Sequence, residues 1–287
     1  MIKKYVFGTP FETEAVVHDV NTEVGALPYF QVSMEQVSGA SSVSLEQSVL
    51  NVLNEDELSN LHEKQTSKYS FRYVMDKEDI VYGLGENIRG INKRGWTYTS
   101  YAMDDPNHLE SIRGLYAAHN FFILDGKKER FGVFFDYPGE MVFDIGYSNI
   151  NEILITPASM DMKVYIIHGD SLKDIVKQFR HMIGRSYIAP RWALGYGQSR
   201  WGYASSEDIR EVCKGYRSNE IPLDLIYVDI DYMKGYRNFT IDKEVYPDFA
   251  ELVQEMKKEN IHLVPIIDAG VKAEKGYFVD DEGVAND

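Results

Sequence analysis

The periodicity of the chain changes near Gly169, and this change constrains the fold more than any other feature of the sequence. Residues 71–167 consist of short β-branched and aromatic runs separated by Gly, Asp, Asn or Pro. Such runs are typical of an antiparallel β-sandwich. After Gly169, helical spacing of apolar residues alternates with near-continuous apolar runs, which is typical of an α/β domain. We therefore predict an N-terminal β-sandwich domain over residues 1–185 and a second domain over residues 186–287.

The second domain has the order strand, helix, strand, helix, strand. We expect its helices to follow the capping residues Ser205 and Asp248, the latter in a capping box with Glu251. The strands are expected at residues 192–198, 223–228 and 263–267. With short connections between these elements, the order predicts the opening of an α/β domain with a parallel sheet.

Two further segments depart from these patterns. Residues 39–67 are rich in Ser, Glu, Gln and Asn, and Ser44 could cap a helix, so we expect a helical insertion without an assigned function. Residues 268–287 are polar and predict no further helix or strand. Three strands and two helices cannot close a (β/α)8 barrel, which needs eight strands and typically ~250 residues. We therefore expect the chain to be the front of a longer one.

Charge and cysteine content exclude several classes of partner. The chain has 45 acidic and 30 basic residues and a net charge of −15, which disfavours nucleic acid and anionic membranes. Neither a signal peptide nor an apolar run of ~18 residues is apparent. The single cysteine, Cys213, excludes an intramolecular disulfide and suits a reducing compartment, so we expect a cytoplasmic protein. The sequence does not indicate an oligomeric state.

Candidate binding residues follow the three apolar runs of the second domain. Trp201 follows the first run, Asp229 and Asp231 follow the second, and Asp268 follows the third. Ligands of parallel α/β folds bind at the carboxyl ends of the strands, so these side chains are expected at one rim. The alternative is structural, because an Asp after a strand is often a turn former or a helix cap and an isolated Trp often packs.

Other motifs do not support cofactor or metal chemistry. Gly83 and Gly85 form a Gly-x-Gly, but no third glycine opens a helix, so a hairpin turn is expected there. The histidines match no metal-binding pattern, and no Gly-x-Ser-x-Gly is present. We expect neither a metal nor a cofactor.

Short segments of both domains occur in an order and at distances that resemble one enzyme family. They are VYGLGE at 81–86 with Trp96, DDPNH at 104–108, the stretch 190–203, YVDIDYM at 227–233 and PIID at 265–268. Together they resemble glycoside hydrolase family 31, the α-glucosidase family. The resemblance implies a mutarotase-like β-sandwich followed by the first β-α-β-α-β of a (β/α)8 TIM barrel. It also implies retaining hydrolysis of terminal α-linked glucose in short oligosaccharides, without a cofactor.

The resemblance also implies roles for individual residues. The residues expected to bind the sugar are Asp104, Trp201, Asp229, Ile230 and Ile266. Those expected to support the site are Asp105, Asp231 and Asp268.

The catalytic carboxylates are missing from the matched motifs. A retaining mechanism needs two carboxyl groups ~5–5.5 Å apart. In this family the nucleophile lies in a Trp-x-Asp-Met-Asn type motif after the fourth strand and the acid/base lies near the sixth, and this sequence contains neither motif. We therefore assign no catalytic residue and expect the 287-residue chain alone to be inactive. The alternatives are a non-catalytic carbohydrate-binding or inactive short product, and an α-xylosidase of the same fold.

Overall fold

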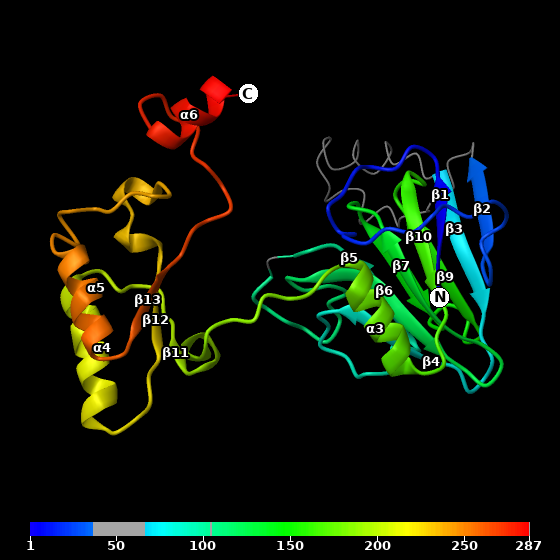
Figure 1. Cartoon of the computed structure of the whole chain (residues 1–287), viewed down its shortest axis with the longest axis horizontal. Coiled ribbons are helices and arrows are strands. Elements are labelled where there is room, and N and C mark those ends of the chain that lie inside the picture. Colours follow the sequence, from blue (N-terminus) through cyan, green and yellow to red (C-terminus); the bar gives the residue numbers. More distant parts are fainter. Residues whose placement is uncertain (37–66, 104, 287) are drawn as a thin grey trace, which may run out of the picture. The chain divides into compact units, whose positions relative to one another are not determined.

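The chain folds into two separate units. The computed structural model describes residues 1–36, 67–103 and 105–286. The helical insertion expected at 39–67 therefore lies outside the described residues, except for Ser67, which begins a strand. The units are Met1–Arg185 and Ser186–Asp287 (Figure 1). None of the described helices is long and apolar enough to cross a membrane.

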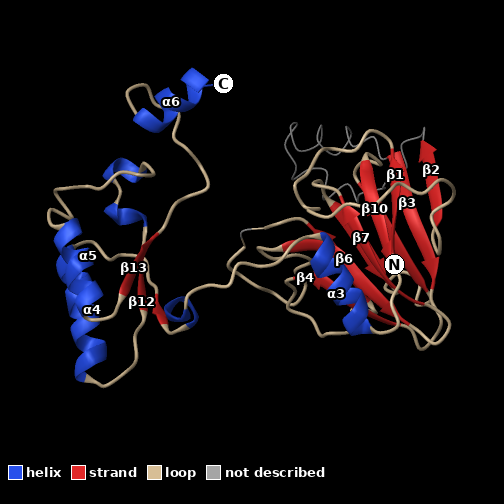
Figure 2. Cartoon of the chain, viewed as in Figure 1, coloured by secondary structure: helices blue, strands red, loops and turns tan. Residues whose placement is uncertain are grey.

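The first unit contains two five-stranded antiparallel sheets, which confirms the predicted β-sandwich (Figure 2). One sheet has the order β1 (Ile2–Phe7), β10 (Met162–Ile167), β7 (Arg130–Asp136), β6 (Ala118–Asp125) and β4 (Ile80–Gly85). The other has the order β2 (Gln31–Gln36), β3 (Ser67–Val74), β9 (Glu152–Pro157), β8 (Met141–Ile145) and β5 (Trp96–Ser100). The first thirty-six residues thus supply a strand to each sheet.

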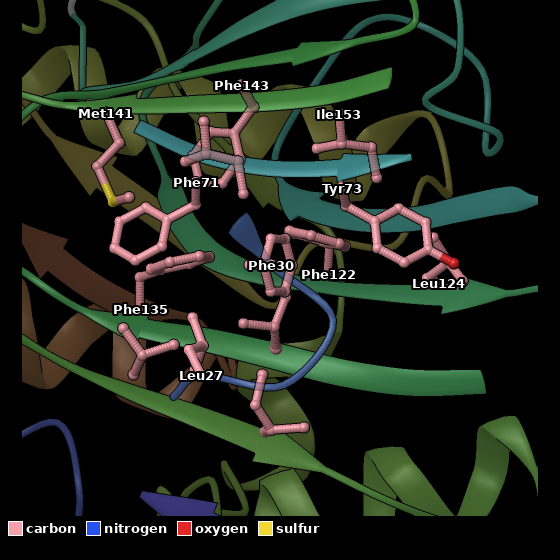
Figure 3. Packing of buried hydrophobic residues seen from close by; sticks show 14 of the residues in the cluster. Leu27, Phe30, Phe71, Tyr73, Phe122, Leu124, Phe135, Met141, Phe143 and Ile153 are labelled. Carbon is pink, nitrogen blue, oxygen red and sulfur yellow. The ribbon is translucent and has the colours of Figure 1, made fainter. Parts of the chain in front are cut away.

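Aromatic side chains fill the space between the two sheets. The ring of Phe71 on β3 meets that of Phe135 on β7 with centroids 5.2 Å apart, and Phe122 on β6 lies 6.2 Å from Phe143 on β8. All four side chains are completely buried, and Figure 3 shows them in one continuous cluster. Edge-to-face contacts of this kind add to the stabilisation from buried apolar area. Much of the aromatic content of the chain therefore belongs to a β-core.

Helix α3 (Leu172–Met182) packs on the first sheet. The helical spacing after Gly169 predicts a helix here, and the hydroxyl of Ser171 caps it by accepting a hydrogen bond from the N–H of Asp174 at 3.2 Å. Phe179 stacks on Phe121 of β6 with centroids 3.8 Å apart. The close approach depends on a glycine of β7, because a Cβ at Gly132 would lie 2.6 Å from a methyl carbon of Ile175.

The Gly-x-Gly segment is not a hairpin turn, in contrast to the expectation. Gly83 and Gly85 lie inside β4, and the register with β6 shifts between them in a β-bulge. Gly83 has a φ of +126°, and a Cβ there would lie 2.5 Å from the carbonyl oxygen of Phe121. Glycines in a strand often mark a bulge or a close backbone approach, and both occur here.

The second unit contains a three-stranded parallel sheet with two helices packed beside it, which confirms the predicted strand and helix order. The sheet order is β11 (Gly197–Gln198), β12 (Leu225–Val228) and β13 (His262–Pro265). The helices are α4 (Ser206–Ser218) and α5 (Phe249–Lys258). Buried apolar residues of both helices pack with Ile226 and Val228 in one cluster. Ser205 caps α4 as predicted, because its hydroxyl accepts from the N–H of Asp208 at 3.2 Å.

Three local predictions in the second unit are wrong. The strand expected at 192–198 shrinks to β11, because a 3-10 helix, Arg191–Leu194, follows Pro190 and Trp192 stacks on His262. The predicted capping box of α5 is absent, because Asp248 bonds to Arg210 and Ser206 instead of the helix backbone. A further helix, α6 (Phe278–Asn286), follows β13.

Residues 268–287, in which we expected no helix because they are polar, contribute acidic side chains to the first turn of α6. The carboxylate of Asp280 accepts from the N–H of Glu274 at 2.9 Å, and that of Asp281 accepts from the N–H of Gly276. Both N–H groups belong to residues before the helix, so these bonds tie the preceding segment to the first turn of α6, and acidic side chains in that turn also face the positive end of the helix dipole. A polar sequence is therefore compatible with this short, exposed helix.

Replacing Gly132 with valine should destabilise the first unit. The added side chain would enter space that Ile175 and Phe121 occupy, and overpacking of this kind typically costs ~1–3 kcal/mol. Gly90→Val is the control, because nothing lies within 4 Å of a Cβ at Gly90 and its φ is not in the left-handed region. Urea unfolding followed by tyrosine fluorescence should show a lower midpoint for Gly132→Val only. Equal midpoints for the two variants would contradict the close packing of α3.

Arg210 should stabilise the second unit in a pH-dependent way. Its guanidinium bonds to Asp248 and to Glu255 (2.7 Å), so it joins α4 to α5 and lowers the pKa of both carboxyl groups. Lowered folded-state pKa values contribute stability above the unfolded-state values near 4, and this contribution disappears as the pH falls through the folded-state values. Arg210→Ala should therefore lower the unfolding temperature by a few degrees at pH 7 and by much less near pH 3. Lys214→Ala, on the same helix, is the control and should leave both temperatures unchanged. A pH-independent effect of Arg210→Ala would argue against the ion pairs.

Candidate functional site

The carboxyl ends of β12 and β13 bring predicted site residues together. The two strands pair in parallel with Val228 opposite Pro265, and the N–H of Ile266 donates to the carbonyl of Val228 at 2.9 Å. Asp229 directly follows β12, and Ile266 directly follows β13. The strand register therefore places these two residues at one edge of the sheet.

Asp229 combines a structural contact with a free acceptor. Its Oδ1 accepts from the N–H of Ile230 at 2.7 Å and caps a single-turn 3-10 helix, Ile230–Tyr232. Asp229 thus also has the structural role of a helix cap, which is the alternative to ligand binding that we considered for an Asp after a strand. The second carboxylate oxygen makes no hydrogen bond to the described part of the chain, so it can accept from a ligand.

Trp201 and Asp231 line a hollow of about 450 Å³ within the second unit. Trp201 is 73% exposed, and Asp231 makes no hydrogen bond or ion pair to any described residue. The other residues that line this hollow are Gly202, Ala204, Met233, Gly235, Tyr236, Asp242 and Val245. An aromatic face and a free carboxylate in one hollow suit a ligand that has both an apolar face and hydroxyl groups.

The negative charge of Asp231 acts on a buried neighbour. Burial raises the pKa of the Tyr246 phenol, and the charges of Asp208 and Asp231 raise it further. The Tyr246 hydroxyl donates to the carbonyl of Tyr203. The phenol therefore stays protonated and holds the backbone at Tyr203, two residues after Trp201.

The residues after β13 are held through their backbone. The hydroxyl of Tyr232 donates to the carbonyl of Ile266 at 2.8 Å, and the N–H of Asp268 donates to the side chain of Asn238 at 2.9 Å. The Asp268 side chain itself is exposed. Ile230 and Ile266 are half-buried, and neither lines the hollow beside Trp201.

The two acidic residues expected from the first unit are placed differently. Asp104 lies outside the described residues. Asp105 is half-buried, and its carboxylate accepts from the backbone N–H and the side-chain amide of Asn107 at 2.9 and 3.0 Å. Both bonds of the Asp105 carboxylate thus lie within a local turn.

Several residues near the rim were not foreseen from the sequence. Tyr236 and Asp242 line the hollow, and Asn238 is 3% exposed while it contacts the segment after β13. Tyr236 lies in a turn without apolar periodicity, so no sequence pattern distinguishes it from a surface residue. Among the described residues, no three His, Cys, Asp or Glu side chains gather closely enough to hold a metal ion.

Comparisons with known proteins agree with these features. A family model described as the family 31 glycosyl hydrolase N-terminal galactose mutarotase-like domain matches residues 10–144. A second, described as the glycosyl hydrolases family 31 TIM-barrel domain, matches residues 186–287. An α-glucosidase (Alpha-glucosidase 2) from Bacillus thermoamyloliquefaciens is 35% identical over 215 residues, which cover 75% of this chain and 27% of that protein.

Solved structures show the same architecture. A family 31 dextranase from Flavobacterium johnsoniae, solved with isomaltotriose, is 26% identical with a TM-score of 0.64, and the match covers 69% of this chain and 24% of the dextranase. A family 31 α-xylosidase from a soil metagenome shares the fold at 18% identity with a TM-score of 0.62, over 76% of this chain and 30% of the xylosidase.

The chain spans less than a third of the length of each of these relatives. Its two matched segments nevertheless correspond to two consecutive domains of a single family, and they include most of the chain. The sandwich and the unit with the parallel sheet lie where the mutarotase-like and TIM-barrel models match. The chain belongs to glycoside hydrolase family 31.

Proposed function

We propose that the chain is the N-terminal part of a retaining α-glucosidase and supplies glycone-binding residues to its active site. The observation that carries the proposal is the pairing of β12 with β13, which sets Asp229, with one free carboxylate oxygen, beside Ile266 at the carboxyl edge of the sheet. In barrels of this kind, substrate binds at that edge. The substrate class is a short α-glucoside oligosaccharide.

The proposed contacts divide the sugar between a carboxylate and apolar side chains. Asp229 accepts hydrogen bonds from ring hydroxyls, and charge-assisted bonds of this kind are worth ~1.5–3 kcal/mol each. Trp201, Ile230 and Ile266 contact the apolar parts of the ring. Asp231 and Asp268 support the site, and Asp104, which the family resemblance implies as a further sugar-binding residue, stays a prediction from the sequence.

The α-glucosidase assignment rests on similarity in sequence rather than in fold. The Bacillus relative named as an α-glucosidase is 35% identical, whereas the α-xylosidase, at 18%, shares the fold alone. The dextranase relative leaves an α-linked glucan as a second candidate substrate, because it was solved with isomaltotriose. We further propose a cytoplasmic location, because a chain with a single cysteine suits a reducing compartment. The Cys213 thiol is buried, and burial raises its pKa, which disfavours the reactive thiolate.

Substitution of Asp229 in the full-length gene product should impair hydrolysis without unfolding the protein. Asp229→Ala should lower kcat/KM for p-nitrophenyl α-glucoside by at least ~10²-fold, because two lost charge-assisted bonds of ~1.5–3 kcal/mol each together exceed the ~2.7 kcal/mol that corresponds to a hundredfold change. Asp229→Asn keeps an oxygen for the N–H of Ile230, so it separates sugar binding from the structural cap. It should still lower kcat/KM more than tenfold.

Asp231→Asn is the matched control for this experiment. It removes a carboxylate two residues away that makes no hydrogen bond within the described chain, and it should reduce kcat/KM less than Asp229→Asn. Thermal unfolding should be measured for all three variants. Near-wild-type kinetics of a folded Asp229→Asn variant would remove Asp229 from the site and with it the proposed function.

The 287-residue chain alone should not hydrolyse α-glucosides. Retaining hydrolysis needs a nucleophile and an acid/base carboxyl group, and the sequence contains neither family motif. Release of p-nitrophenol by the purified chain should equal that of a mock purification. Release above this background that Asp229→Ala abolishes would show that these residues suffice for catalysis and would overturn the assignment of no catalytic residue.

A further inference from the structure

Asn238 fastens the segment after β13 to the segment after β12. Its side-chain oxygen accepts from the N–H of Asp268 at 2.9 Å. Its amide nitrogen donates to the carbonyl of Asp268 at 2.9 Å and to the carbonyl of Gly270 at 2.8 Å. The residue is only 3% exposed, so water does not compete for these bonds. A single buried side chain thus binds three backbone groups of the segment that begins beside Ile266.

A second set of contacts holds Asn238 itself. The hydroxyl of Tyr277, which is 2% exposed, donates to the carbonyl of Asn238 at 2.7 Å. The guanidinium of Arg237 lies 5.9 Å from the centre of the Tyr277 ring and pairs with Glu274 at 3.5 Å. Both ends of the segment 268–277 therefore contact the turn that contains Asn238.

The backbone around Asn238 is strained. Tyr236 has a φ of +56° and Phe239 a φ of +61°, although bulky side chains rarely occupy this left-handed region. Such residues persist only where surrounding contacts determine the conformation, and they are frequent at functional sites. The bonds of Asn238 and Tyr277 hold this turn to the segment after β13, and the Thr240 hydroxyl holds it from within by bonding to the backbone of Lys234 and Arg237.

From this geometry we infer that Asn238 is a positioning residue of the glycone subsite. It holds the segment that carries Ile266 and Asp268 in place against the segment that carries Asp229. The inference rests on the proposed function. Asn238 touches no sugar in this scheme; it fixes the distance between residues that do. Small displacements of binding groups are costly, since a misplacement of about 1 Å can reduce a rate by ~10²-fold.

The amide chemistry of Asn238 makes the inference specific. Aspartate has nearly the same shape and keeps the acceptor for the N–H of Asp268, but it has no donors for the carbonyls of Asp268 and Gly270. A carboxylate in that position would face two carbonyl oxygens while buried, which is unfavourable. Asn238→Asp should therefore release the segment as Asn238→Ala does, although it preserves size.

The test combines kinetics with amide hydrogen exchange in the full-length gene product. For Asn238→Ala and Asn238→Asp we expect kcat/KM for p-nitrophenyl α-glucoside to fall about 10- to 10²-fold, mainly through kcat. Exchange should accelerate at residues 268–270. Asn219→Ala is the control: the Asn219 amide bonds to the carbonyl of Gly215 at the end of α4, which leads into the amino end of β12 and not to the rim at its carboxyl end, and its loss should change neither readout. A merely structural role would lower the unfolding temperature and leave kcat and KM of the folded enzyme unchanged.

A milder variant covers the case in which both substitutions prevent folding. Tyr277→Phe removes only the hydroxyl that bonds to the carbonyl of Asn238, and it should lower kcat and accelerate exchange at residues 268–270 to a smaller extent. Folded variants with kcat and exchange within twofold of wild type would overturn the inference. Failure of this inference can be distinguished from failure of the proposed function by measuring Asp229→Asn in parallel. If the proposed function is wrong, Asp229→Asn will also have normal kinetics; if only the positioning role of Asn238 is wrong, Asp229→Asn will still be impaired.

Discussion

The parallel pairing of β12 with β13 is the constraint on which the rest of the candidate site depends. Parallel strands end at the same edge, so the register of Val228 opposite Pro265 brings together two segments that are almost forty residues apart in the sequence. Backbone hydrogen bonds set this register, and the apolar side chains of β12 hold it against α4 and α5. The position of Asp229 relative to Ile266 thus depends on the sheet register and on core packing, and the bonds of Asn238 hold the segment that follows Ile266.

Each unit has its own hydrophobic cluster and its own source of rigidity. The sandwich depends on aromatic rings between its sheets and on the fit of α3 over Gly132. The barrel start has the smaller hydrophobic cluster, and polar contacts supply part of its order: Arg210 joins α4 to α5, and Asn238 joins the segments at the rim. Polar contacts of this kind are directional, so they fix positions more narrowly than apolar packing does. They are therefore suited to a region that must hold ligand-binding groups in place.

The carboxylates near the rim illustrate how one residue type takes several roles. Asp229 caps a turn and keeps one free oxygen, whereas Asp231 lies in the hollow beside Trp201 without a hydrogen-bond partner in the described chain. Asp248, predicted as a helix cap, pairs with Arg210 instead. The sequence contains the same side chain at each position, and only the neighbouring groups decide what it does.

The sequence by itself determined the fold class, the order of the elements and the family, because these depend on local periodicity and on short motifs that keep their spacing. It also identified Trp201, Asp229 and Asp268 as residues at strand ends. Only the tertiary structure decided the bulge at Gly83, the helix α6 and the clamp at Asn238. Each of these depends on partners that are distant in the sequence or on backbone contacts, and neither leaves a periodic pattern. An asparagine in a turn looks the same in sequence whether it faces water or binds three backbone groups, and only the fold brings those groups within reach.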